Sequence, residues 1–128
     1  KKKKKNPEYY KTVFHTPCET LPPDFCIITA HNPDGETIDS SDNEQRDEEL
    51  SQELEKLKAP GFRITGMAPD RSHSEAGWGT TCPVETAIEL GRKYQQEAIF
   101  RISGDQLFLI DCSNETETKC GKFTLLTD

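Results

Sequence analysis

The sequence predicts an α+β fold, in which two helices pack on a mainly antiparallel sheet of about five to six strands. Short segments rich in aromatic and β-branched residues recur along the chain, two longer segments have helical periodicity, and clusters of Gly, Pro, Asn and Asp separate them. The 128 residues are the length of one domain. We therefore expect a lysine-rich disordered tail over residues 1–7 and a single domain over residues 8–128, with an acidic helical segment at 34–60.

The first part of the chain contains two expected strands and a helix. The strands, which are rich in aromatic and β-branched residues, are 8–14 and 25–30. The run Asn32-Pro33-Asp34-Gly35 is a turn signal that ends the second strand. A helix is expected over residues 42–58, because Asp42 is a suitable N-cap and Pro60-Gly61 ends the pattern.

The middle of the chain is expected to be strand, loop and helix. Residues 61–67 have the composition of a third strand. Residues 68–82 are expected to form a loop, because they carry Pro69, Gly77 and Gly79. The second helix is expected over residues 83–94, since Pro83 is favourable in a first turn.

The last part of the chain is expected to contain a hairpin and a closing strand. Residues 97–103 and 106–112 flank Gly104-Asp105, a two-residue turn of the kind that hairpins use. Pairing outward from this turn places Phe100, Ile102, Leu107 and Leu109 on one face, and Ile99, Phe108 and Ile110 on the other. Both faces are largely apolar, so the hairpin is expected in the centre of the sheet. The final strand is expected over residues 122–126.

Charge and composition exclude several functional classes. The chain has 16 basic and 23 acidic residues, and five of the 16 are Lys1 to Lys5. Such an acidic body argues against bulk coating of nucleic acid. No apolar run is long enough to span a membrane, and no signal-peptide core is visible, so a cytoplasmic location is expected. The five cysteines include no C-x-x-C pair, and phosphate-loop and dinucleotide motifs are missing, so no metal and no cofactor is expected.

The first expected helix carries a stripe of mixed polarity. Leu50, Leu54 and Leu57 share one helical face, and the same face continues backward through Arg46 and Asn43. Because the leucines face the core, Asn43 and Arg46 are expected to point toward the body of the domain. An inward guanidinium needs a partner. Arg46 could form a structural salt bridge with Asp70 or Glu75, or it could await a carboxylate or phosphate in a polar pocket.

Three blocks of the sequence together resemble a known family. They are Thr29-Ala30-His31-Asn32-Pro33 followed by Asn43-x-x-Arg46, Arg63-x-x-Gly66 with His73-Ser74-Glu75, and the stretch from Ala87 to Phe100 that contains Leu90-Gly91-Arg92 and Gln96. In order and spacing they resemble the bacterial family catalogued as domain of unknown function 3293. The resemblance implies a bacterial, cytosolic, single-domain protein, and it supplies no reaction.

The polar positions of these blocks suggest a ligand site. Carried over from the resemblance, they are Thr29, Asn32, Asn43, Arg46, Glu75 and Gln96. Our leading hypothesis is a ligand-binding or regulatory domain with a pocket for a small anionic or nucleotide-like ligand. Arg46 would pair with the anion, Glu75 would orient Arg46, and the three amides would add hydrogen bonds. Arg63 is a candidate second anion clamp, and Trp78 could stack on a planar ligand or plug the edge of the core.

Two hypotheses from other classes remain open. In the first, the protein is a hydrolase or nuclease in which His73 and Glu75 transfer protons. This enzyme would need His73 within hydrogen-bond reach of Glu75 and a second arginine beside them. In the second, the protein is an interaction module without pocket chemistry, whose protein partner the sequence does not identify. Arg46 would then be consumed by an internal carboxylate, and no cavity would remain.

Overall fold

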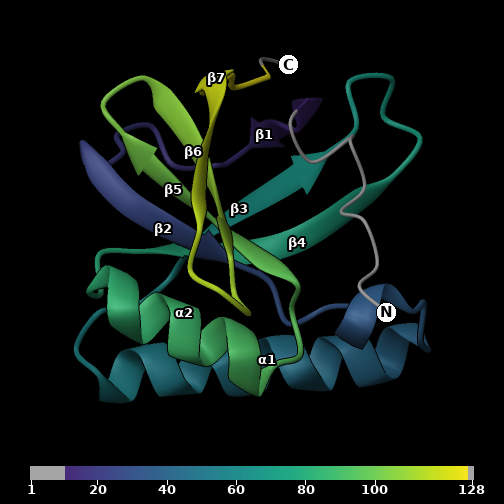
Figure 1. Ribbon diagram of the computed structural model, residues 1–128. Helices are drawn as coiled ribbons and strands as arrows, with labels where there is room; N and C mark the ends of the chain where they lie inside the picture. Colours follow the sequence, from purple (N-terminus) through teal and green to yellow (C-terminus); the bar gives the residue numbers. More distant parts are fainter. Residues whose placement is uncertain (1–10, 127–128) are drawn as a thin grey trace.

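A computed structural model describes residues 11–126, which form two helices on one face of a curled seven-stranded sheet (Figure 1). The expected tail over residues 1–7 lies outside the described residues, as does the first part of the expected strand 8–14. The elements in chain order are β1 (Val13–His15), β2 (Asp24–Ile28), α1 (Ser40–Lys56), β3 (Phe62–Met67), β4 (Ser74–Thr80), α2 (Val84–Lys93), β5 (Ala98–Ser103), β6 (Gln106–Asp111) and β7 (Glu117–Lys122). The α+β class is confirmed, whereas the expected five to six strands are one or two too few.

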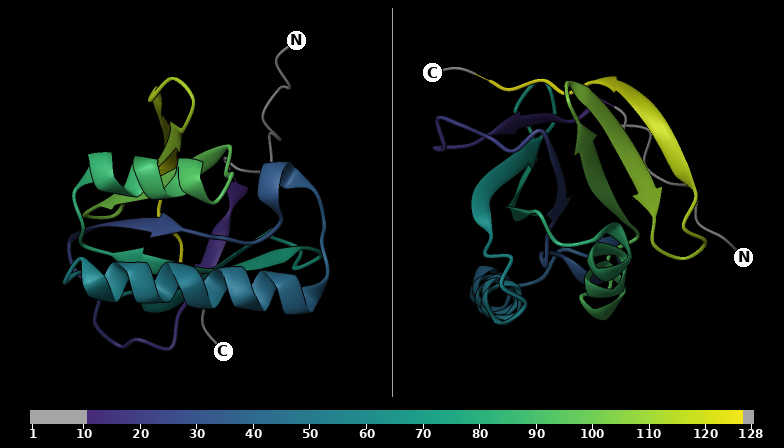
Figure 2. Two further views of the ribbon diagram at one scale, coloured as in Figure 1. Left: turned by 90° about the horizontal axis from the view of Figure 1, so that it is seen from below. Right: turned by 90° about the vertical axis from the view of Figure 1, so that its left-hand side faces the viewer.

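The sheet has the order β1-β3-β4-β2-β5-β6-β7, and its pairs of neighbouring strands are antiparallel. The expected hairpin is confirmed as β5 and β6, in the register that the Gly104-Asp105 turn predicts. Both helices cover one face, and the sheet curls away from them (Figure 2). Ile28, Leu50 and Leu54 belong to the core beneath the helices, whereas Phe14 and Ile27 belong to a second core inside the curl.

The two ends of the curled sheet are joined by the residues that follow β7. The Phe14 amide donates to the Thr124 carbonyl at 2.9 Å, and the Leu126 amide donates to the Phe14 carbonyl at 2.7 Å. The expected strand 122–126 is therefore misplaced, because β7 ends at Lys122 and the residues after it cross over to β1. This closure brings β1 and the end of the chain together beside the inner core, which includes Phe14 and Phe25.

The strand β4 lies where the sequence predicts a loop over residues 68–82, so that prediction is wrong. Gly77 and Gly79 are ordinary turn signals, but here they allow close approach. A Cβ on Gly77 would lie 2.9 Å from the Ile28 carbonyl oxygen, and a Cβ on Gly79 would lie 2.3 Å from the Phe62 ring. Glycine in a strand interior often marks such contacts. β4 is accordingly an internal strand, between β3 and β2.

The ends of α1 differ from the expected ones. The N-cap is Asp39 rather than Asp42, and the helix ends before Pro60-Gly61. Lys58 adopts the left-handed conformation, and the Ala59 amide bonds back to the Leu54 carbonyl, which is a Schellman ending. Leu57 is the C-cap of α1 and is 49% exposed, so its expected place in the core stripe is wrong. Leu50 and Leu54 are fully buried as expected.

Three of the five cysteines are buried in this fold. Cys26, Cys82 and Cys112 are buried, and no disulfide links the five cysteines, all of which lie among the described residues. Burial raises the pKa of the Cys26 thiol to about 12 and raises that of Cys82 above its usual range. Both thiols therefore stay protonated at neutral pH. No helix within residues 11–126 has the length and apolarity needed to cross a membrane.

Candidate functional site

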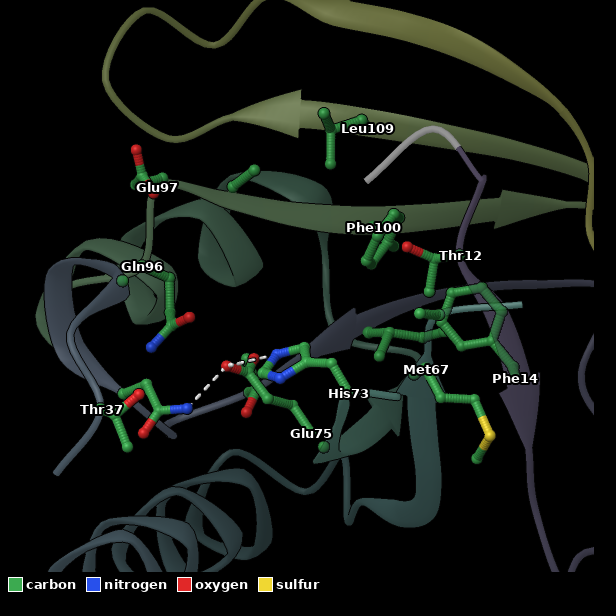
Figure 3. A pocket seen from close by; sticks show the side chains of 18 of the residues that line it. Thr12, Phe14, Thr37, Met67, His73, Glu75, Gln96, Glu97, Phe100 and Leu109 are labelled. Atoms are coloured by element: carbon green, nitrogen blue, oxygen red, sulfur yellow. Dashed lines mark hydrogen bonds and ion pairs between the residues drawn. The ribbon is translucent and has the colours of Figure 1, made fainter. Parts of the chain in front are cut away.

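A cavity of about 480 Å³ opens on the side of the sheet away from the helices, between the 3₁₀ turn Pro33–Gly35 and the β3–β4 loop. Its lining combines apolar residues, which include Phe14, Ile27, Met67, Ala98, Phe100 and Leu109, with polar ones, which include Asn32, Asp34, Thr37, Glu75, Gln96 and Glu97. Figure 3 places Thr37, Gln96 and Glu97 at one end, called the polar end here, and Phe14 and Met67 with Thr12 at the other, called the apolar end. The site is therefore amphipathic, as small-ligand pockets usually are.

Glu75 is held at the polar end by a pair of asparagines. The Asn32 Nδ2 donates to Glu75 Oε2 at 3.0 Å. Asn43 is buried, and its side chain makes two hydrogen bonds with Asn32. Asn43 Oδ1 accepts from the backbone amide of Asn32 at 2.8 Å, and Asn43 Nδ2 donates to Asn32 Oδ1 at 3.0 Å. Asn32 itself has a φ of 50°, a conformation that Asn tolerates better than most residues. The geometry thus brings three predicted residues together and fixes the direction of the Glu75 carboxylate.

Gln96 presents an acceptor to the cavity. Its Nε2 donates to the His31 carbonyl at 2.9 Å and to the Tyr94 carbonyl at 3.1 Å. Both amide protons are therefore used, and Gln96 Oε1 has no hydrogen bond from the described residues. Thr29 is also in the lining, but its hydroxyl donates to the Ala76 carbonyl at 2.8 Å and accepts from the His31 amide at 3.1 Å.

Arg46 points inward as predicted, but it does not line the cavity. Its Nε donates to the Ala30 carbonyl at 2.7 Å, Nη1 donates to Gln95 Oε1 at 3.2 Å, and Nη2 donates to the Tyr94 carbonyl. The expected salt bridge to Asp70 or Glu75 is wrong: among the described residues no carboxylate lies within ion-pair distance of Arg46.

The contacts of Arg46 give it a structural role. Tyr94 is the C-cap of α2, whose terminal carbonyls lack partners inside the helix. A cation at this end of a helix is favourable. Arg46 therefore joins α1 to the end of β2 and to the end of α2, and it shares the Tyr94 carbonyl with Gln96. Through this shared carbonyl Arg46 is connected to Gln96, which lines the cavity.

Arg63 and Trp78 are held in a different network. Arg63 makes two hydrogen bonds to the Asp47 carboxylate, at 3.1 and 2.7 Å, and its guanidinium lies 3.8 Å from the centre of the Trp78 ring. The Trp78 Nε1 donates to the Asp47 carbonyl at 3.1 Å. Neither Arg63 nor Trp78 lines the cavity. The pair fastens α1 to β3 and β4. Because both side chains lie outside the cavity lining, Arg63 is not placed to bind an anion there, and Trp78 is not placed to stack on a ligand there.

Replacing Asp47 with Asn is expected to weaken this fastening. The Asp47 side chain is only 14% exposed, and its loss of charge leaves the Arg63 guanidinium without an ionic partner. We expect the free energy of unfolding to fall by about 1–2 kcal/mol in a urea titration. The fluorescence of Trp78, which is the only tryptophan, should shift to the red in the folded state. The exposed control Glu44→Gln should have the same free energy of unfolding as the wild type. If Asp47→Asn also leaves the free energy of unfolding unchanged, the fastening role is disproved.

His73 and Glu75 do not have the geometry of an acid/base pair. His73 Nε2 lies 3.9 Å from Glu75 Oε2, beyond hydrogen-bond distance, and the His73 side chain is 68% exposed. No arginine is among the described residues that line the cavity with His73 and Glu75, and Arg63 is bound to Asp47. Within residues 11–126 no group of three His, Cys, Asp or Glu side chains could hold a metal ion.

The apolar end of the cavity is the part of the site that sequence reasoning missed. Phe100 and Leu109 fall on one apolar face of the predicted hairpin, which was expected to lie in the centre of the sheet. The available signal was that both faces of the hairpin are apolar, which is more apolar surface than two helices can cover. The sheet is curled (Figure 2). Phe100 and Leu109, on the face inside the curl, line the cavity.

A comparison with family models places the chain. A model described as "Protein of unknown function (DUF3293)" matches residues 28–99. No curated protein and no solved structure gives a significant match. The matched residues include the asparagine pair, Arg46, Glu75 and Gln96. Since the match covers more than half of the 128 residues, the chain belongs to the DUF3293 family.

Proposed function

We propose that this protein is a small-molecule-binding domain and that the cavity beneath the curl is its binding site. The observation that carries the proposal is the two-ended lining, in which Phe14 and Phe100 stand opposite Glu75 and Gln96 (Figure 3). A volume of about 480 Å³ suits a small organic molecule. The polar groups are already oriented by their own hydrogen bonds, which lowers the entropy that binding must overcome.

The proposal keeps part of the sequence-based hypothesis. It retains Asn32, Asn43, Glu75 and Gln96 as site residues, with Asn43 acting through Asn32. It does not retain the anionic ligand, because Arg46 lies behind the wall and neither Lys nor Arg occurs in the lining. We assign this binding function to the cytoplasm, in line with five cysteines and no disulfide.

A thermal-shift screen of the wild type against Ala98→Phe tests the proposal. Ala98 lines the cavity, so the added ring is expected to fill part of the space that a ligand would use. A compound present at 100 times its dissociation constant should stabilise the wild type by about 2.7 kcal/mol, which corresponds to several degrees. Ala98→Phe should melt normally and lose this shift.

The control is Thr118→Phe, which places the same ring at an exposed position of β7. It should respond to ligand like the wild type. If no compound in a diverse library shifts the wild type, or if Ala98→Phe responds as strongly, the cavity is not a binding site.

A further inference from the structure

We infer that the ligand is a protonated amine with an apolar arm, and that Glu75 and Gln96 receive its ammonium group. The inference rests on the proposed function and names the ligand class of that site. It is carried by the charges, the free acceptors and the apolar end of the cavity.

The charges around the cavity are negative. Asp34, Glu75 and Glu97 are among the described residues that line the cavity, and none of these lining residues is a lysine or an arginine. Of the described lining residues, His73 alone has a side chain that can become cationic, and this side chain is 68% exposed and 3.9 Å from Glu75. The lining therefore carries a net negative charge, which repels an anion and attracts a cation.

Two acceptors at the polar end lack a hydrogen-bond donor. Asn32 Nδ2 donates to Glu75 Oε2, and Gln96 Nε2 donates to two backbone carbonyls. Gln96 Oε1 and the second Glu75 oxygen, Oε1, have no hydrogen bond from the described residues. An ammonium group has three donors and no acceptor, so it complements this set. Figure 3 shows the Glu75 and Gln96 side chains directed into the same space.

Glu75 is built to keep its position. Its side chain is 27% exposed, which leaves it partly shielded from solvent. Asn32 donates a hydrogen bond to one carboxylate oxygen of Glu75, and the buried Asn43 makes two hydrogen bonds with Asn32. A carboxylate fixed in this way forms a stronger ion pair than a mobile surface one.

The apolar end requires that the ligand also carries hydrocarbon. Phe14 and Phe100 meet edge to face, with ring centres 5.3 Å apart, and Leu109 is buried beside them in the lining. Figure 3 places Phe14, Phe100 and Met67 away from Gln96 and Glu97. A bare ammonium ion or a short polar diamine would leave this surface in contact with water, so an aryl or alkyl amine fits better.

Three probes of matched shape test the inference by isothermal titration calorimetry and NMR titration: 2-phenylethylamine, 2-phenylethanol and 3-phenylpropionate. We expect the wild type to bind the amine about tenfold more tightly than the alcohol, and to bind the carboxylate least. Glu75→Gln preserves an acceptor for Asn32 but removes the charge, so it should bind amine and alcohol alike. Glu89→Gln changes the net charge equally on the exposed face of α2 and should keep the preference.

Each result decides the matter. If the alcohol or the carboxylate binds the wild type as tightly as the amine, the inference is wrong and the proposed function stands. If Glu89→Gln reduces the preference as much as Glu75→Gln, the preference comes from the overall charge of the protein, and the inference is again wrong. If none of the three probes binds the wild type at millimolar concentration although a compound of the thermal-shift library does, the inference is wrong and the proposed function stands. If the library also gives no shift, the proposed function fails together with the inference. A cooperative thermal unfolding transition of each variant confirms that it is folded.

Discussion

Arg46→Met should lower the free energy of unfolding by about 3–5 kcal/mol, since two backbone carbonyls lose a charged donor. Ala30 is fully buried, and its carbonyl accepts from Arg46 Nε at 2.7 Å. The Tyr94 carbonyl at the end of α2 keeps only the weaker bond from Gln96. A melting temperature lower by about 10 °C or more is the expected outcome for a domain of this size.

The matched control for this substitution is Arg71→Met, which removes an exposed guanidinium from the β3–β4 loop. It should stay within about 0.5 kcal/mol of the wild type. Urea titrations followed by circular dichroism compare the three proteins. A stable, fully folded Arg46→Met variant that had lost only ligand binding would contradict the structural role and would restore Arg46 as a ligand residue.

Gly77→Ala should destabilise the protein by about 3 kcal/mol, which is at the upper end for an added methyl group. The new Cβ would lie 2.9 Å from the Ile28 carbonyl oxygen in β2 and 3.5 Å from the Ile64 carbonyl oxygen in β3. Both neighbours are backbone atoms of strands that pair with β4, so neither can rotate aside.

The comparison for Gly77→Ala is Ser74→Ala, at the exposed start of the same strand. Ser74→Ala should change the stability by less than about 0.5 kcal/mol in the same urea titration. Equal stability of the two variants would mean that β4 is not an internal strand, and the sheet order would have to be revised.

The fold was predictable wherever local pattern and tertiary role agree. The hairpin around Gly104-Asp105 satisfies both the turn rule and the pairing rule, so its register is confirmed. β4 was missed because Gly77 and Gly79 serve close packing between strands, and this use of glycine cannot be distinguished from a turn in one sequence. The number of strands was underestimated for the same reason.

The candidate site was predictable in its polar half only. Periodicity on one helix placed Asn43 and Arg46 toward the body of the domain, and the structure confirms this direction. The partners of Arg46 could not be predicted, because they are backbone carbonyls, which every residue carries. Phe100 and Leu109 look like core residues in the sequence, and only the curl of the sheet leaves space beside them.

The central claim, that the cavity binds a small molecule whose amine meets Glu75, is tested most directly by mapping NMR shifts on addition of 2-phenylethylamine. The expected map shows changes at the backbone amides of residues 32–37, 72–77 and 96–98, together with the side-chain amide of Gln96. These groups surround the cavity from three separate parts of the chain. Changes confined to residues 42–49, on the acidic helix α1, would instead show attraction of a cation to the charged surface and would contradict the claim.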